Sequence, residues 1–229
     1  MQYPIITREL LRNMVMFVDQ YRRNHPDLQQ ESDIDASLFN ALAQAPVAER
    51  LRIFPGWDRV GKIFLKPRGD RDRPVLKADQ EQFGEETGKL DFPKGKPSDV
   101  RRGDIIITFG TGDRCVLGVH RVLSEPEERS AEEQQSDPDA QRWPWFVYAE
   151  NFTPQFGNCW WEHDITIDRV AGEFNAARPD APISAAGSKS LGAFNFGAGR
   201  LLLADDFGRF IGDRILAVEE QLRGRIGQD

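Results

Sequence analysis

Cysteine and histidine are scarce in this sequence, and long apolar runs are missing from it. Its 229 residues include two cysteines and three histidines, and two cysteines are too few for the disulfide framework of a small secreted domain. No stretch of the sequence approaches the ~20 apolar residues of a membrane-spanning helix. The opening MQYPIITREL lacks the basic start and apolar stretch of a signal peptide. We therefore expect a cytoplasmic protein that does not enter a membrane.

The charge balance is acidic. The formal net charge is −7 at pH 7, with 29% charged and 39% hydrophobic residues. This composition is typical of a globular chain, and its sign argues against non-specific coating of a polyanion such as DNA. Much of the acid is concentrated in residues 125–141, so a local basic patch elsewhere stays possible.

Residues 1–51 have a helical pattern. Apolar residues recur at helical spacing after a capping Thr7: Leu10, Leu11, Met14, Phe17, Val18 and Tyr21. A second helix is predicted over residues 35–51, after a polar connection that contains Pro26. We divide the chain into an N-terminal helical segment, 1–51, which could dock a protein partner, and a domain over 52–229.

Residues 101–175 are predicted to form a β core. Residues 104–109 are rich in β-branched side chains, and residues 114–123 follow after a Gly-rich turn, so the two should pair as a hairpin. Gly118 in the second strand indicates a bulge or a close approach of backbone. Further strands are predicted at residues 62–65, 145–151 and within 160–170.

The other segments of the second domain are predicted to be loops and one helix. Residues 84–99 show no clear period, and residues 125–141 read as a mobile surface loop. An amphipathic helix is predicted from Asp205 or Asp206, as the cap, to about residue 223.

The stretch from residue 101 to 168 resembles the EVE branch of the PUA-like superfamily, which is related to YTH and ASCH domains. Three pieces carry the resemblance: the basic-Gly-Asp start and apolar strand of residues 100–109, the glycine-containing strand of residues 115–122, and Trp143 with the strand after it. The resemblance implies an α+β fold, a small mixed β-barrel with flanking helices. It also implies a nucleic-acid-binding module with a pocket for a modified or flipped base, in RNA or DNA.

Such a pocket needs flat aromatic surfaces and a few polar groups that contact the base edge. The candidate ligand-binding residues are Trp57, Phe109, Thr111, Trp143, Trp145, Trp160 and Trp161. The tryptophans could equally be core and rim aromatics of a barrel. Candidate phosphate contacts are Lys62, Arg68, Arg101 and Arg102, although nearby acids also allow a solvated surface of mixed charge.

Catalytic motifs are absent from the sequence. It contains no Gly-x-Ser-x-Gly elbow, no His-Glu-x-x-His and no phosphate-binding glycine loop. The pairs Cys115/His120 and Cys159/His163 could ligate zinc, but the first pair faces opposite sides of a regular strand. We predict no catalytic residue, metal or cofactor. The alternatives are a metal-dependent hydrolase using Glu150, Glu162, Asp164 and Asp168, and a protein-interaction domain.

Overall fold

The structure, a computed structural model, describes residues 61–93, 95–191 and 199–226. From Lys62 onward these residues belong to one compact unit, Lys62–Asp229. The predicted helices of residues 1–51 and Trp57 lie outside the described residues, so the domain division stays a prediction. Among the described residues, no helix combines the length and the apolar character needed to cross a membrane.

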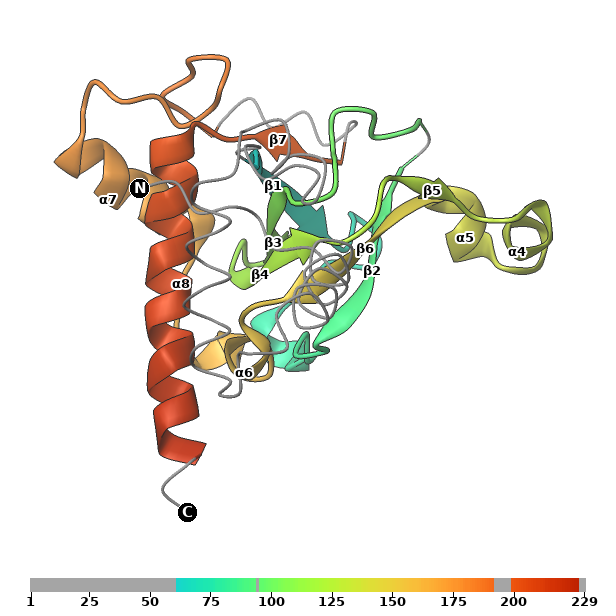
Figure 1. Cartoon of the computed structure of the whole chain (residues 1–229). Helices are drawn as coiled ribbons and strands as arrows, with labels where there is room; N and C mark the ends of the chain where they lie inside the picture. Colours follow the sequence, from blue (N-terminus) through green and yellow to red (C-terminus); the bar gives the residue numbers. More distant parts are fainter. Residues whose placement is uncertain (1–60, 94, 192–198, 227–229) are drawn as a thin grey trace, which may run out of the picture. The chain divides into compact units, whose positions relative to one another are not determined.

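The unit is α+β and is built on a seven-stranded mixed sheet (Figure 1). The strands are β1 (Ile63–Arg68), β2 (Thr87–Phe92), β3 (Ile105–Gly110), β4 (Val116–Val122), β5 (Glu127–Glu128), β6 (Trp145–Asn151) and β7 (Leu201–Leu202). Their order is β2-β6-β4-β3-β1-β7, and β5 pairs with β6. Neighbouring strands are antiparallel, except that β1 and β3 run parallel.

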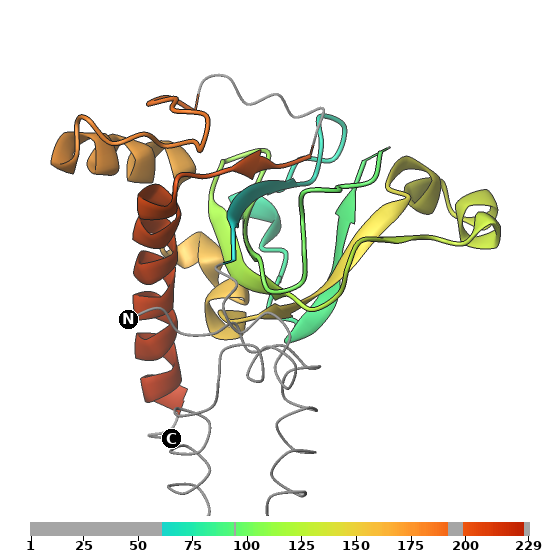
Figure 2. The same ribbon diagram turned by 45° about the horizontal axis from the view of Figure 1, so that its top comes forward.

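Helices and helical turns lie between and after the strands. The α-helices are α4 (Ala131–Ser136), α5 (Pro138–Arg142), α6 (Pro154–Gly157), α7 (Ile167–Ala177) and α8 (Asp205–Ile226). Two 3₁₀ turns, η1 (Lys77–Asp79) and η2 (Trp160–Glu162), are the other helical elements of the described residues. Figure 2 shows α8 beside the curled sheet, whereas α4 and α5 extend away from its other side.

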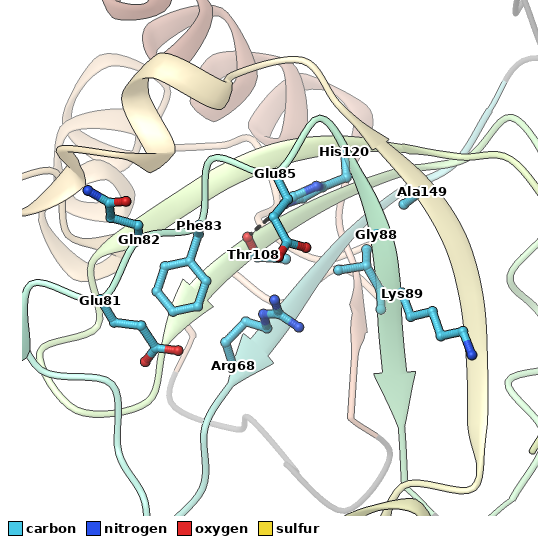
Figure 3. A pocket seen from close by; sticks show the side chains of 11 residues that line it. Arg68, Glu81, Gln82, Phe83, Glu85, Gly88, Lys89, Thr108, His120 and Ala149 are labelled. Atoms are coloured by element: carbon cyan, nitrogen blue, oxygen red, sulfur yellow. Dashed lines mark hydrogen bonds between the residues drawn. The ribbon is translucent and has the colours of Figure 1, made fainter. Parts of the chain in front are cut away.

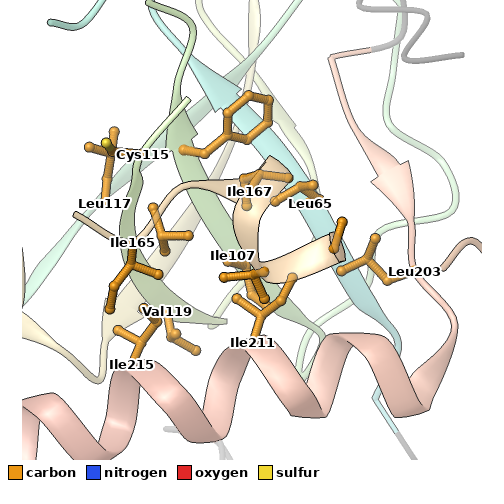
Figure 4. Close-up of a cluster of buried hydrophobic side chains, with 14 of the residues drawn as sticks. Leu65, Ile107, Cys115, Leu117, Val119, Ile165, Ile167, Leu203, Ile211 and Ile215 are labelled. Atoms are coloured by element: carbon orange, nitrogen blue, oxygen red, sulfur yellow. The ribbon is translucent and has the colours of Figure 1, made fainter. Parts of the chain in front are cut away.

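The side chains of β1, β3 and β4 alternate between two cores, because successive residues point to opposite faces. One face packs against α7 and α8, and Figure 4 shows Ile107 and Val119 of the sheet beside Ile211 and Ile215 of α8. The other face is concave and encloses a second cluster: Phe64, Leu90, Phe92, Val100, Ile106, Val122, Val147 and Ala149. This second cluster joins β1 to β2, so the sheet curls until its two ends approach each other.

The predicted α+β class is confirmed, but the mixed sheet of the described residues does not close into the predicted small barrel. Within the described residues, no strand pairing joins β2 to β1 or β7. The free edge of β1 is instead partly occupied by β7, which pairs with Phe64 and Leu65. In the described part of the chain, the sheet is therefore open between β2 and β7.

Several other predictions are confirmed. The β3–β4 hairpin forms, and its register shifts between Thr108 and Phe109, beside Gly118. A Cβ atom on Gly118 would lie 3.2 Å from both His120 Nε2 and Thr153 Oγ1, so the glycine also permits the close approach that was predicted. The strands predicted near residues 62–65 and 145–151 and the helix from Asp205 are present.

Two other predictions from the sequence are wrong, and one strand was not predicted. Residues 160–170 form η2 and the start of α7 rather than a strand. Thr166 caps α7, because its side chain accepts a hydrogen bond from the backbone N–H of Arg169. Residues 87–92, which show no period, form β2, and residues 125–141 hold β5, α4 and most of α5 instead of a mobile loop.

Candidate functional site

A cavity of about 160 Å³ opens on the concave face of the sheet. Five strands contribute to its wall, and the segment before β2 covers one side of it (Figure 3). It is lined by Arg68, Glu81, Gln82, Phe83, Glu85, Gly88, Lys89, Leu90, Thr108, His120 and Ala149. The side chain of Lys89 itself points to the outer face, where its Nζ lies 4.2 Å from the ring centroid of Phe146.

The cavity exists because the concave side chains change character along each strand. At one end they are bulky and apolar, and toward the cavity they become small or polar. The changes run from Phe64 to Arg68 in β1, Ile106 to Thr108 in β3, Val122 to His120 in β4, Val147 to Ala149 in β6, and Phe92 to Gly88 in β2. The apolar ends fill the floor of the curled sheet, and the small and polar ends leave a hollow above it.

Phe83 and Arg68 form the stacking part of the cavity. The guanidinium carbon of Arg68 lies 5.4 Å from the ring centroid of Phe83, within the range of a cation–π contact. Both side chains are half-buried and project into the cavity (Figure 3). Among the described residues, Arg68 has no carboxylate within ion-pair distance.

Thr108 and His120 supply neutral polar groups at the bottom of the cavity. The hydroxyl of Thr108 lies 3.1 Å from His120 Nε2 and 3.4 Å from the carbonyl oxygen of Gly118. Burial, together with the charges of Arg68 and Lys66, lowers the pKa of His120 from 6.5 to about 3. The imidazole is therefore neutral at physiological pH, and with one N–H and one acceptor nitrogen it can take part in hydrogen bonds of either sense.

Backbone hydrogen bonds hold the segment that carries Phe83. The Phe83 N–H donates to the carbonyl of Gly157 at 2.9 Å, and Asn151 Nδ2 donates to the Phe83 carbonyl at 2.9 Å. The indole N–H of Trp160 donates to the Glu81 carbonyl at 2.8 Å. A Cβ on Gly157 would lie 2.5 Å from the Phe83 carbonyl oxygen, so only glycine permits this approach. The aromatic wall is thus preorganised before any ligand arrives.

The rim of the cavity is acidic. Glu81 and Glu85 both line it, and both residues are exposed to solvent. Figure 3 shows Glu85 at the upper side of the opening and Glu81 beside Phe83. Polarity therefore changes with depth, from exposed carboxylates at the rim, through Arg68 and Phe83, to the neutral pair at the bottom.

The structure does not bring the predicted aromatic residues together in this cavity. Among the described tryptophans, Trp160 is buried behind the Phe83 segment, with the two ring centroids 6.4 Å apart. Trp161 packs on the core that faces the helices, where Phe109 is fully buried. Trp145 packs against the concave cluster, Trp143 ends α5, and Thr111 lies in the β3–β4 turn.

The predicted phosphate contacts are also separated. Arg68 ends β1 at the cavity, whereas Lys62 precedes β1, and Arg101 and Arg102 precede β3. Because β1 and β3 run parallel, these three residues lie at the other end of the strands. Six residues of extended chain span roughly 20 Å, which is too far for one nucleotide to reach both ends.

The candidate metal ligands do not converge in the described part of the chain, where no group of three or more His, Cys, Asp or Glu side chains could hold an ion. Glu150, Asp164 and Asp168 instead form separate ion pairs with Arg121, Lys77 and Arg114. Cys159 Sγ lies 3.5 Å from His163 Nε2, and Cys115 is buried in the core on the other face of the sheet from His120.

No protein-family model and no curated protein matches the sequence. Among solved structures, the chain is similar to the human THYN1 protein in complex with DNA that contains 5-methylcytosine, at 10% sequence identity and a TM-score of 0.43. The similarity covers 70% of this chain and 98% of that chain. Membership of the EVE branch stays a prediction.

Proposed function

We propose that the cavity binds a single planar base, which a nucleic acid presents unpaired or flipped out of its helix. The observation that carries this proposal is the convergence of an aromatic ring, a guanidinium and a neutral hydroxyl–imidazole pair in one hollow of about 160 Å³. Drug-sized ligands occupy pockets of ~300–1,000 Å³, so a cavity of this size suits one small ring system.

Each part of the cavity matches a property that all nucleobases share. A base has a flat π face for the ring of Phe83 and a polar edge for Thr108, His120 and Arg68. The edge of a base inside a duplex is not available to such a hollow, so the base must be single-stranded or extruded. Unstacking costs a few kcal/mol, and this cost is lowest for mismatched, damaged or single-stranded bases.

The charge distribution supports recognition by the cavity rather than by the phosphate backbone. The chain carries a net charge of −7, and the rim carboxylates of Glu81 and Glu85 repel phosphates. A protein that neutralises many phosphates shows a steep loss of affinity with salt. We expect a shallow salt dependence here, because few phosphates are contacted.

The apolar part of the wall makes a modified base the preferred form of the ligand. Leu90 and Ala149 line the cavity beside its polar groups. Apolar side chains contact the methyl group of thymine in DNA recognition, and these two could contact a methyl substituent in the same way. Oligonucleotides that differ only in one base methyl group, compared by titration, test this finer proposal.

The binding proposal is tested by fluorescence anisotropy with labelled oligonucleotides that carry one unpaired base or, at the same position, an abasic site. The unpaired base should bind more tightly. Stacking contributes ~1–3 kcal/mol per base, so Phe83→Ala should weaken binding by about tenfold or more. Phe83→Leu keeps an apolar side chain there but lacks the π face, and it should lose a similar amount.

The matched control is Tyr148→Ala, which removes an aromatic ring from the outer face of β6, where Tyr148 is 44% exposed. Circular dichroism checks that each variant is folded. Equal affinity of wild type and both Phe83 variants for every oligonucleotide, or equal affinity for the base and the abasic site, would contradict the proposal.

A further inference from the structure

Arg68 is the most specific polar group that the cavity offers. It ends β1, its side chain is half-buried, and its guanidinium lies against Phe83, where a base would stack. Within the described part of the chain no carboxylate neutralises it at ion-pair distance, although Glu81 and Glu85 line the same cavity. A guanidinium has five N–H donors in a planar fork and no acceptor, so Arg68 can only donate to a ligand.

The positive charge of Arg68 acts at the bottom of the cavity. It is a cause of the lowered pKa of His120, after burial, and also of the lowered pKa of the neighbouring Lys66. Two buried groups on two strands therefore sense the same cation. The interior end of the cavity consequently favours electron-rich atoms over hydrogen-bond donors.

The rim carboxylates of Glu81 and Glu85 attract hydrogen-bond donors of the base, but they influence its orientation less than Arg68 does. Glu81 and Glu85 are exposed, and water screens exposed charges strongly. Charge-assisted hydrogen bonds strengthen where water is excluded, which favours the half-buried Arg68. Because Arg68 is more buried than the two carboxylates, its charge has the larger effect on the edge of the base that enters the cavity first.

We propose that the base enters with a hydrogen-bond-acceptor edge toward Arg68, so that the cavity selects bases with a ring carbonyl over bases with an amino group at the same position. This inference rests on the proposed function, because it names the class of base that the same cavity takes. An amino group facing Arg68 would place two donors against each other, and the guanidinium would lose the acceptor that the exocyclic carbonyl supplies. That penalty, rather than the attraction alone, produces the selection.

The test uses two pairs of bases that differ in one exocyclic group and in the hydrogen on the ring nitrogen beside it. Uracil has a carbonyl and an adjacent ring N–H where cytosine has an amino group and an adjacent acceptor nitrogen. Hypoxanthine and adenine differ in the same way. Each base is placed unpaired at one site of the same oligonucleotide. The carbonyl member of each pair should bind at least tenfold more tightly (about 1.4 kcal/mol).

Variants assign this preference to Arg68. Arg68→Met keeps an unbranched side chain of similar reach but removes the charge, and should reduce the preference to within about twofold. Arg68→Lys keeps the charge but loses the planar fork, and should retain only part of the preference. The matched control is Lys189→Met, which removes an exposed cation from the segment after α7 and should leave the preference unchanged.

The outcomes separate the inference from the proposed function. If binding depends on Phe83 but both members of each pair bind equally, or the amino member binds more tightly, the inference is wrong and the function stands. A preference for carbonyl bases that survives in both Arg68 variants also overturns the inference. If Phe83→Ala changes no affinity, the proposed function itself fails.

Discussion

Lys66 provides the sharpest test of the energetics of the concave face. Its side chain is 4% exposed, and its ammonium group lies 4.9 Å from the ring centroid of Phe92 and 3.3 Å from the carbonyl oxygen of Pro67. Burial first, then the charges of Arg68 and Arg200, lower its pKa from 10.5 to about 7, against an opposite effect of Asp91. Replacing Lys66 by Met should therefore stabilise the protein at neutral and lower pH.

The size of the effect follows from the pKa. A lowering from 10.5 to about 7 corresponds to about 5 kcal/mol, at ~1.36 kcal/mol per unit. Methionine has a similar length and fills irregular space well, but it loses the cation–π contact, worth about 1–2 kcal/mol when desolvated. We expect the free energy of unfolding of Lys66→Met to exceed that of the wild type by about 3 kcal/mol at pH 6.

The pH dependence has a defined sign. Because the folded-state pKa of Lys66 lies below the unfolded value, the unfolded chain binds more protons between about pH 7 and 10.5. Wild-type stability therefore gains ~1.4 kcal/mol per pH unit from this group as the pH rises through that window. The advantage of Lys66→Met is full below pH 7 and should shrink by this amount per unit between pH 7 and 9.

Urea unfolding of wild type and variant at pH 6, 7, 8 and 9, followed by tryptophan fluorescence, measures both quantities. Lys62→Met is the control, since Lys62 is exposed and its removal should change stability little at any pH. A constant difference between Lys66→Met and wild type across this range, or a less stable variant at pH 6, would refute the reasoning.

Two further predictions concern groups around the cavity. The pKa of His120 is lowered from 6.5 to about 3 in the folded protein, so the unfolded chain takes up a proton on this imidazole first. Acidification from pH 6.5 toward 3 should therefore lower stability by up to ~1.4 kcal/mol per pH unit. His120→Gln should remove this part of the acid denaturation curve, measured by circular dichroism. Trp160→Phe removes the indole N–H that donates to the Glu81 carbonyl, and should cost ~1–3 kcal/mol and accelerate hydrogen exchange at the Phe83 amide, measured by mass spectrometry.

Local patterns were sufficient to predict much of the sheet. The β3–β4 hairpin has β-branched runs on either side of a Gly-rich turn, and α8 has an apolar stripe behind an acidic cap, so short-range signals decide both elements. The strand predicted within residues 160–170 was wrong because its apolar residues also fit a helix. The signal that distinguishes them is Thr166 as the cap of α7.

Strand pairings between distant segments could not be predicted from the sequence. β2 carries glycine, lysine and aspartate, which disfavour strands locally, and it forms because six of its residues pair with β6. The open seam lies between β2 and β7, and β7 is a two-residue strand that pairs with part of the edge of β1. Neither pairing has a local pattern, since each is decided by which segments meet after the chain has folded.

The cavity follows from the change from bulky to small or polar side chains along each strand. This pattern is present in the sequence, but it can be recognised only when the register of the paired strands is known. Every second side chain of β1 points to the concave face: Phe64, Lys66 and Arg68. Lys66 lies opposite Thr108 in β3, so small and polar side chains from separate strands meet at one end of this face. The tryptophans do not mark this cavity, because large rings fill a curled sheet more readily than they line it. Trp160 accordingly supports the wall from behind, and the smaller ring of Phe83 faces the hollow. In a curled sheet of this size, the position where side chains become small on every strand is therefore a better guide to a ligand site than the position of the largest aromatic residues.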